Sequence, residues 1–150
     1  MSDALNERDA EARVRDSFAR QTIMTTIGAS VHSVRRGEVE IVLPFADHIL
    51  QQHGFIHAGA VATIADSACG YAALSVMPAD AAVLTTEFKI HLLSPAKGER
   101  LRAVGRVVRA GKKLVITSGD VFADEGGTSK HVALITATMM VVETATGLRN

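Results

Sequence analysis

The segment that most constrains the fold of this chain is residues 53–74, HGFIHAGAVATIADSACGYAAL. From residue 58 to about residue 76 the side chains are apolar nearly all the way round a helix. The helix should stop before Pro78, because a residue that precedes a proline is pushed out of the helical region. Such a helix has to be covered on most of its sides. Asp66 lies in its middle, where an ionised carboxylate is disfavoured unless it is paired or hydrogen-bonded.

Around this helix the chain predicts one further helix and two groups of strands. Residues 4–20 have helical spacing and belong to a peripheral helical segment, residues 1–27. VHSVRRGEVEIVLP alternates on both sides of Arg36-Gly37, which is typical of a hairpin. After the central helix come four strand-like segments separated by turns rich in Gly, Pro and Ser: AVLTTEFKIHLL, ERLRAVGRVVRA, KKLVITSGDVFAD and KHVALITATMMVVE. The last is apolar on both faces over residues 132–142, which predicts an interior position in a sheet.

These elements predict a single α+β domain over residues 1–150, in which a curved antiparallel sheet wraps around the central helix. A chain of 150 residues can bury one substantial core and is too short for two ordinary domains. One layer of sheet cannot cover an apolar helix on every side. We therefore expect a second copy of the chain to supply the missing cover, and hence at least a dimer.

Composition excludes several classes of function. The 16 basic residues balance the 16 acidic ones, so no net charge attracts nucleic acid or an anionic membrane. No apolar run approaches the roughly 20 residues that cross a bilayer, and the charged opening MSDALNERDAEARVRDSF lacks the apolar region of a secretory signal. With one cysteine, and with histidines that lack metal-ligand spacing, we expect a cytoplasmic protein with no metal, no membrane partner and no nucleic-acid partner.

Asp66 has two interpretations. No lysine or arginine lies between Asp47 and Lys89, which excludes an ion pair within the helix. In the structural interpretation, Asp66 lies at a solvent-exposed edge of the helix or is hydrogen-bonded to Thr63, one turn earlier. In the functional interpretation it lines a cleft, where it takes a proton from water or acts as the nucleophile.

The N-terminus of the same helix predicts a site for negative charge. Gly54 and Gly59 flank His57 and allow close backbone approach, and first-turn N–H groups such as those of Ala58 and Gly59 lack helical partners. At a rise of about 1.5 Å per residue, Asp66 lies about 12 Å along the axis from Ala58, so one carbonyl group cannot touch both. If both serve one reaction they come from two subunits, and the dimer is the catalytic unit.

The chain resembles the PaaI-like thioesterases of the hotdog fold, which hydrolyse acyl-CoA or aryl-CoA thioesters. The resemblance covers about residues 28–143 and rests on the spacing of five elements rather than on any one of them. The family has Asn where this chain has Gln51, and Gly where it has Ala58. The matching elements are Gln51, Gly54, His57-Ala58-Gly59, Asp66, and Thr85 ahead of the turn SPA at residues 94–96.

The resemblance implies a role for four of these residues. Asp66 would be the general base or the nucleophile, and the Ala58 N–H group would polarise the thioester carbonyl. Gln51 would hold that carbonyl or the attacking water. Thr85 would line the site from the partner subunit and orient the water or the carboxylate.

Other residues are candidates for substrate binding. His57 and Gly59 lie at the predicted oxyanion site, and His53 lies in the loop that leads to it. The phosphates of coenzyme A need cations, which a basic hairpin would supply, although such a hairpin is also typical of a solvated surface. The basic residues of this hairpin are Arg106, Arg109 and Lys112, with Arg100, Arg102 and Lys113 near them.

The predicted function is hydrolysis of an acyl-CoA or aryl-CoA thioester to a free acid and coenzyme A, with no cofactor besides the coenzyme A of the substrate. The resemblance also suggests a homotetramer formed as a dimer of dimers. A non-catalytic acyl-CoA-binding sensor or carrier is the alternative, and Gln51 in place of Asn favours it. A hydratase ranks lowest, because His57 is too far from Asp66 on its own helix to act with it.

Overall fold

The computed structural model describes residues 5–143 and 147–150. Residues 1–4, which begin the predicted N-terminal segment, lie outside the described part. None of the helices in this part is long and apolar enough to span a membrane. The helices are α1 (Glu7–Ala19), α2 (Thr22–Ile27) and α3 (Ala58–Leu74), with a 3-10 turn at Asp47–Ile49, and the strands are β1 (Ser30–Arg35), β2 (Glu38–Pro44), β3 (Ala82–Leu92), β4 (Arg100–Ala110), β5 (Leu114–Glu125) and β6 (Thr128–Val142).

The predicted central helix is α3, and it ends two residues earlier than the sequence indicated, at Leu74. Just beyond this end, the Ser75 hydroxyl donates a hydrogen bond of 2.6 Å to the carbonyl of Ala72. The same hydroxyl oxygen accepts the N–H of Gly37 at 2.7 Å. These bonds satisfy a terminal carbonyl of the helix and tie its end to the turn between β1 and β2.

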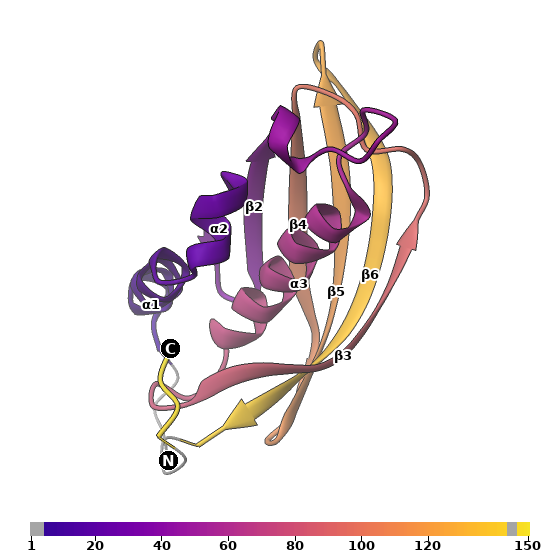
Figure 1. The fold of residues 1–150 in the computed structure, drawn as a ribbon. Coiled ribbons are helices and arrows are strands. Elements are labelled where there is room, and N and C mark those ends of the chain that lie inside the picture. The colour runs from indigo at the N-terminus through magenta and orange to yellow at the C-terminus, as the bar shows by residue number, and fades with distance from the viewer. Residues whose placement is uncertain (1–4, 144–146) are drawn as a thin grey trace.

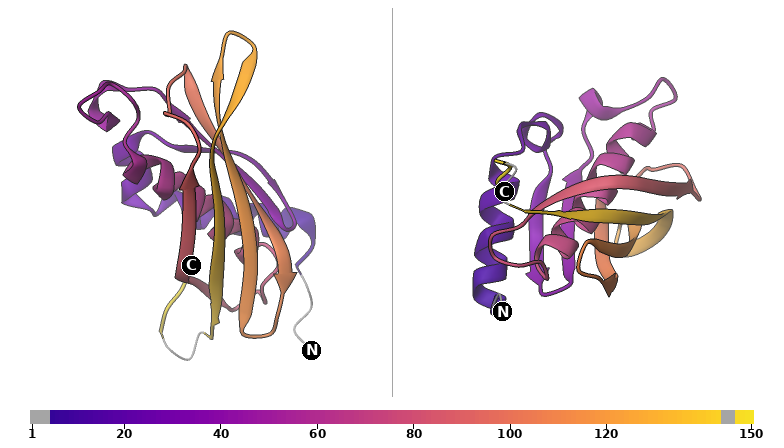
Figure 2. Two further views of the ribbon diagram at one scale, coloured as in Figure 1. Left: turned by 90° about the vertical axis from the view of Figure 1, so that its right-hand side faces the viewer. Right: turned by 90° about the horizontal axis from the view of Figure 1, so that it is seen from below.

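All six strands form one antiparallel sheet in the order β1-β2-β4-β5-β6-β3. The sheet curves around α3 (Figure 1), and all three helices lie on the same side of it (Figure 2). The prediction of an α+β hotdog fold, with an antiparallel sheet wrapped around a long central helix, is confirmed. The predicted interior position of the last strand is also confirmed, because β6 lies between β5 and β3.

The two faces of β6 differ, although the sequence is apolar on both. Ile135 and Met139 face α3 and are fully buried. Leu134 and Met140, on the outer face, are 36% and 37% exposed. The chain therefore covers only the inner face of this strand.

Close contact between helix and sheet explains why α3 is built from small residues. A Cβ atom at Gly105 of β4 would collide with the backbone of Ala68, and one at Gly119 of β5 would come within 3.0 Å of the Cys69 sulfur. The backbones approach so closely that no larger side chain fits between them. Between these contacts the core is filled by Val39, Ile41, Leu43, Ile64, Leu101 and Ile135, all fully buried.

The N-terminal segment covers part of α3 on the side away from the sheet. Val14 of α1 is fully buried, and the rings of Phe18 and Tyr71 lie 5.9 Å apart. Arg13 donates hydrogen bonds of 3.3 Å to the carbonyls of Leu74 and Met77. The cover of α3 was expected from a second copy, and the chain supplies part of this cover itself.

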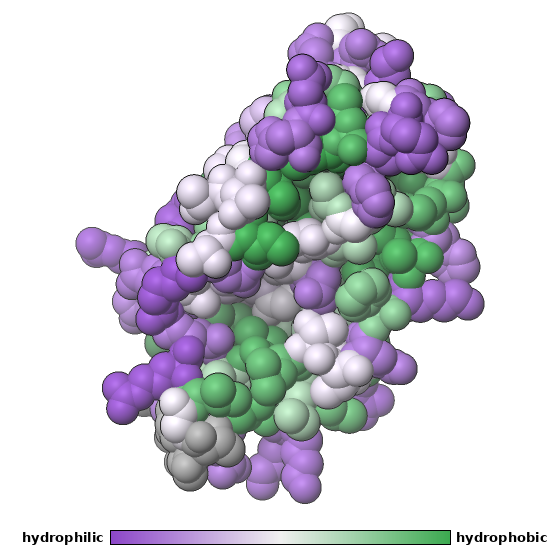
Figure 3. All heavy atoms as spheres, in the orientation of Figure 1, coloured by the Kyte–Doolittle hydropathy of each residue, from purple (hydrophilic) through white to green (hydrophobic). Residues whose placement is uncertain are grey.

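The strand β3 forms one edge of the sheet, and its inner face is incompletely covered. Phe88 pairs with Ala137, and Ile90 pairs with Ile135. Directly paired residues of an antiparallel ladder point to the same face, so Phe88 points toward the helix side with the buried Ala137. Phe88 is nevertheless 46% exposed and Leu92 is 54% exposed. Apolar surface is visible on this side of the molecule (Figure 3).

Candidate active site

Asp66 lies on the face of α3 that meets β3. The Thr85 hydroxyl donates a hydrogen bond of 2.8 Å to Asp66 Oδ1. Partial burial raises the pKa of the Asp66 carboxyl above its usual value, and the hydrogen bond from Thr85 opposes that shift because it stabilises the charged form. The carboxylate is therefore oriented by one neighbour and kept more basic than a solvated aspartate.

Two expectations about Asp66 are corrected. Thr63 does not contact it, because the Thr63 hydroxyl donates to the carbonyl of Gly59 at 2.8 Å. Thr85, which was expected from the partner subunit, belongs to the same chain as the Asp66 that it contacts. The reason is topological: the chain turns back after α3, and β3 then runs beside the middle of that helix.

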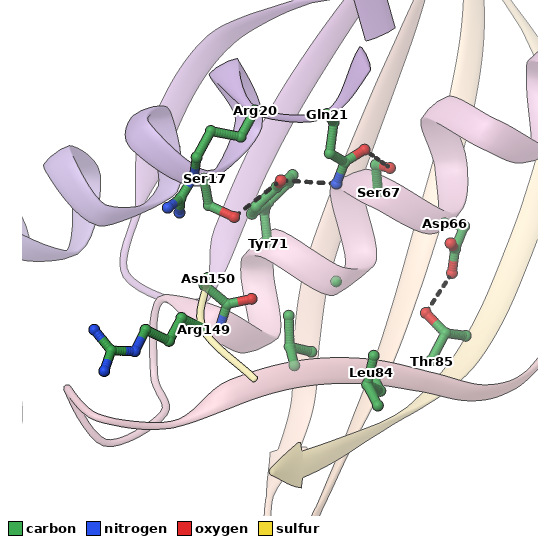
Figure 4. A pocket seen from close by; sticks show the side chains of 12 residues that line it. Ser17, Arg20, Gln21, Asp66, Ser67, Tyr71, Leu84, Thr85, Arg149 and Asn150 are labelled. Carbon is green, nitrogen blue, oxygen red and sulfur yellow. Dashed lines mark hydrogen bonds between the residues drawn. The ribbon is translucent and has the colours of Figure 1, made fainter. Parts of the chain in front are cut away.

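Asp66 opens into a cavity of about 460 Å³, which we call the Asp66 cavity. Figure 4 shows the residues that line it, which come from α1 and the segment after it, from α3, from β3 and from the last two residues of the chain. Most of the groups that line it are polar. On the helical side they are Ser17, Arg20, Gln21, Asp66, Ser67 and Tyr71.

A hydrogen-bond network around Tyr71 forms one wall of this cavity. The Gln21 amide donates to the Tyr71 hydroxyl at 2.7 Å, and that hydroxyl lies 3.2 Å from the Ser17 hydroxyl. The Ser67 hydroxyl donates to Gln21 Oε1 at 3.5 Å. Sequence reasoning missed this wall. The available signal was Tyr71 itself, the one tyrosine of the chain, whose hydroxyl needs a partner when it is buried among small apolar residues.

The first turn of α3 leaves one N–H group free. His57 caps the helix, and its Nδ1 accepts the N–H of Gly59 at 2.8 Å. The N–H groups of Ala60 and Val61 bond to the carbonyl of His57. The exposed N–H of Ala58 has no acceptor among the described residues. The predicted oxyanion donor is therefore present at Ala58, whereas the N–H of Gly59 is already used by the cap.

A second cavity, of about 510 Å³, lies at this helix start, and we call it the N-terminal cavity. Gln51 lines it, and Gln51 Oε1 accepts the backbone N–H of His53, which leaves its amide nitrogen as a donor. His53 is exposed and does not line the cavity. The lining is mostly apolar and includes Phe55, Ile56, Val61, Leu92, Leu93 and Val132.

The two groups predicted to act in catalysis, the Asp66 carboxylate and the Ala58 N–H, lie in different cavities. Asp66 and Ala58 lie on the same uninterrupted helix, eight residues from each other. At about 1.5 Å per residue this is about 12 Å along the axis. Within one chain, a thioester bound at the Ala58 N–H group is out of reach of the Asp66 carboxylate.

The basic hairpin does not reach either cavity. Arg106 lies on the outer face, where its side chain bonds to Glu38 at 2.9 Å and lies 3.6 Å from Asp120. Arg109 and Lys112 are exposed and line neither cavity. Arg106 was predicted to bind phosphate, but neighbouring carboxylates compensate its charge.

Cys69 and the histidines form no additional centre. Cys69 is buried, and burial raises the pKa of its thiol to about 12, so it remains protonated and inert. Within residues 5–143 and 147–150, no group of three His, Cys, Asp or Glu side chains is placed to hold a metal ion.

Residues 53–130, which contain α3 and both halves of the site, match the family model of the thioesterase superfamily. A protein of Halobacterium salinarum that is provisionally named an esterase is 31% identical over 108 residues. The match covers 69% of this chain and 71% of that protein. The chain therefore belongs to the thioesterase superfamily, and its class is that of a thioester hydrolase.

Solved structures agree with this assignment. A thioesterase family protein from Silicibacter pomeroyi is 46% identical, with a TM-score of 0.88 over 89% of this chain and 98% of that chain. The E. coli PaaI protein from the phenylacetic acid degradation operon is 18% identical, with a TM-score of 0.79 over 91% of this chain and 95% of that one. At 18% identity, the similarity to PaaI shows that the two proteins share a fold. It confirms the resemblance to PaaI-like hotdog proteins.

Proposed function

We propose that the protein hydrolyses acyl-CoA or aryl-CoA thioesters to a free acid and coenzyme A, at two sites shared between two copies of the chain. The observation that carries the proposal is that Asp66 and the free N–H of Ala58 lie in separate cavities of one chain. Neither cavity alone contains both the Asp66 carboxylate and the free N–H group of the helix start.

The edge strand β3 supports the pairing of two copies. It is 11 residues long, and no strand in the described part of the chain pairs with its free edge. An unpaired strand of this length is a template for another strand. Phe88 lies near its middle and half exposes an aromatic ring on the inner face, where a second copy would bury it.

Antiparallel pairing of β3 with its twofold mate would bring the two cavities together. Leu84 and Thr85, near the start of β3, line the Asp66 cavity. Leu92 and Leu93, at its end, line the N-terminal cavity. In an antiparallel pair centred on the strand, the start of one copy lies beside the end of the other. The Asp66 of each copy would then face the Ala58 N–H group of its mate.

The proposed reaction begins when a water oxygen attacks the thioester carbonyl carbon while Asp66 takes the water proton. The resulting oxyanion is held by the Ala58 N–H of the other copy, with the Gln51 amide nitrogen as a second donor. Collapse of the tetrahedral intermediate breaks the carbon–sulfur bond, and the thiolate of coenzyme A takes the proton from Asp66. Thr85 keeps the carboxylate in its orientation throughout.

The direct-attack variant, in which Asp66 forms a mixed anhydride that water then hydrolyses, uses the same residues. Single turnover in ¹⁸O-labelled water tests for it. Label in the Asp66 carboxyl identifies the anhydride route, with water attacking the aspartyl carbonyl, because the water route labels only the product acid.

The cytoplasmic location and the assembly of two such dimers into a homotetramer are further parts of this proposal. Leu84, Met140 and Leu114 are direct neighbours across three strands on the outer face of the sheet. Each is more than a third exposed. A contiguous apolar row of this kind supports packing of one dimer against another.

Subunit complementation tests the shared site. Asp66→Asn removes the base, and Ala58→Pro removes the N–H donor at a helix position where proline is well tolerated. Each variant alone should lose most of its activity. A doubly tagged dimer with one subunit of each kind contains one intact site and one doubly defective site, and it should regain up to about half of the wild-type rate.

If each site lay within one chain, every site of the mixed dimer would be defective and no activity would return. A monomer that still hydrolyses the substrate would also contradict the proposal. The binder alternative is tested in the same assay, because a chain that binds acyl-CoA and releases no thiol is not a hydrolase of that substrate.

A further inference from the structure

Two arginines from distant parts of the sequence line the Asp66 cavity. Arg20 follows α1, and Arg149 lies next to the end of the chain. The tail that carries Arg149 is held by the Asn150 side chain, which donates to the carbonyl of Ala81 at 3.1 Å. In Figure 4 both arginines lie on the opposite side of the view from Asp66 and its partner on β3.

Neither arginine has an acidic partner among the described residues. Arg15, by contrast, bonds to Glu11, and Arg106 bonds to Glu38. Asp66 is the one acidic side chain among the described residues that line the cavity. The cavity therefore combines a carboxylate on one side with two uncompensated cations on the other, and the hydroxyl and amide groups between them are neutral and bonded to each other.

Gly70 leaves open space in the wall of this cavity. It lies inside α3 and lines the cavity, and a Cβ atom added there would meet no atom within 4 Å. Glycine inside a helix costs stability relative to alanine. No contact within the chain requires a glycine here, unlike Gly105, where a Cβ would collide with α3. Gly70 keeps the cavity open between Asp66 and the arginines.

We infer that Arg20 and Arg149 form an anion subsite for the substrate of the proposed thioesterase reaction, and that its ligand is the carboxylate at the far end of a dicarboxylic acyl group. The inference rests on the proposed function, since Asp66 marks the position of the thioester. An arginine guanidinium binds a carboxylate through two parallel hydrogen bonds. Two arginines that lack acids of their own are suited to that role.

Distance favours the acyl group over coenzyme A as the source of the anion. Arg20 precedes Gln21, whose amide bonds to the Tyr71 hydroxyl, and Tyr71 lies five residues after Asp66 on α3. Five residues span about 7.5 Å along a helix, which a short acyl chain can bridge. The pantetheine arm that separates the sulfur of coenzyme A from its phosphates is longer. A phosphate at the subsite is therefore the less favoured source of the same chemistry.

The test compares thioesters of matched length with and without a terminal carboxylate, such as glutaryl-CoA and valeryl-CoA. Wild-type protein should prefer glutaryl-CoA. Arg20→Gln and Arg149→Gln should each lower kcat/KM for glutaryl-CoA about tenfold to a hundredfold, mainly through KM, and leave valeryl-CoA unchanged. Arg20→Lys should retain part of the preference. Arg36→Gln, an exposed arginine in the β1–β2 turn, is the matched control.

The same variants are measured with N-acetylcysteamine thioesters, which carry no phosphate. Equal losses for both CoA esters, with unchanged N-acetylcysteamine esters, would support the anion subsite and assign it to a phosphate. Unchanged kinetics for every ester in the double variant would overturn the inference. Asp66→Asn serves as the separate test of the proposed function. If Asp66→Asn inactivates the enzyme while the arginine variants act on every ester as the wild type does, only the anion subsite is rejected and the proposed function stands.

Discussion

The Asp66 cavity and the N-terminal cavity are built on the same helix and are lined by different kinds of residue. Most residues that line the first are of polar types, including the carboxylate and two unpaired arginines. The second is mostly apolar and contains the one free N–H of the helix start. A hydrolase needs a base and an oxyanion donor within reach of one carbonyl. Each cavity is therefore half of a site.

The two cavities also differ in how the chain builds them. The N-terminal cavity comes from the loop before α3, the end of β3 and the turn that follows it, and the Ile56 N–H bonds to the Ala96 carbonyl between these segments at 2.8 Å. The Asp66 cavity needs α1, α3, β3 and the last two residues of the chain. Mechanism is expected to depend on α3, and selectivity on the segments that meet only in the folded chain.

The largest effect is expected from removing the base. Asp66→Asn should lower kcat about 10²- to 10⁴-fold, because general-base catalysis typically contributes this factor. Thiol release from an acyl-CoA measures the loss. Undiminished turnover in this variant would show that Asp66, and with it the Asp66 cavity, supplies no catalytic base.

The same variant should be more stable than the wild type at neutral pH. The pKa of Asp66 is raised in the folded state, so the folded wild-type protein binds this proton more tightly than the unfolded chain does. Wild-type stability from this group is therefore greatest below the ordinary aspartate pKa and is lost as pH rises through the folded-state pKa. The stability advantage of Asp66→Asn should vanish in acid, which thermal unfolding at several pH values tests.

A somewhat smaller effect is expected at the N-terminal cavity. Ala58→Pro should lower kcat about 10²- to 10³-fold, since it removes one oxyanion donor. The fold should survive, because His57 already has a backbone conformation, ψ 139°, that a following proline accepts. Ala58→Gly retains the N–H group and should stay active. Equal activity of the proline and glycine variants would show that this N–H group takes no part.

The smallest effect is expected from the side chain that orients the base. Thr85→Val removes the hydrogen bond that lowers the pKa of Asp66, so this pKa should rise further. Since the base acts in its ionised form, the acid limb of the kcat/KM profile should move to higher pH, with the larger loss at acidic pH. Thr85→Ser should preserve the profile. Thr86→Val, whose hydroxyl bonds to the carbonyl of Thr138 instead, is the control on the same strand.

Several features of this protein could be predicted from sequence because they depend on local order. The apolar run from residue 58 to about residue 76 indicates a helix to be wrapped by a sheet, and the structure ends this helix at Leu74. The positions of Asp66 and Ala58 on that helix determine that one carbonyl cannot reach both. The glycine before His57 and the following helix start indicate where an oxyanion would bind.

Other features could not be read from sequence because they depend on which distant segments meet. Thr85 reaches Asp66 of its own chain, and Ser17 and Gln21 bond to Tyr71, only through the packing of β3 and α1 on α3. The same holds for charge: Arg106 and Arg149 look alike in the sequence, but sheet register places a carboxylate beside the first.

The sequence by itself determined the central helix, the acid in its middle and the separation of the two catalytic groups, since helical spacing is set by residue order alone. Only the tertiary structure decided which hydroxyl holds the acid, which arginines stay uncompensated and what lines each cavity. Long-range packing decides these, because a side chain's partner depends on the strands and helices that fold against it.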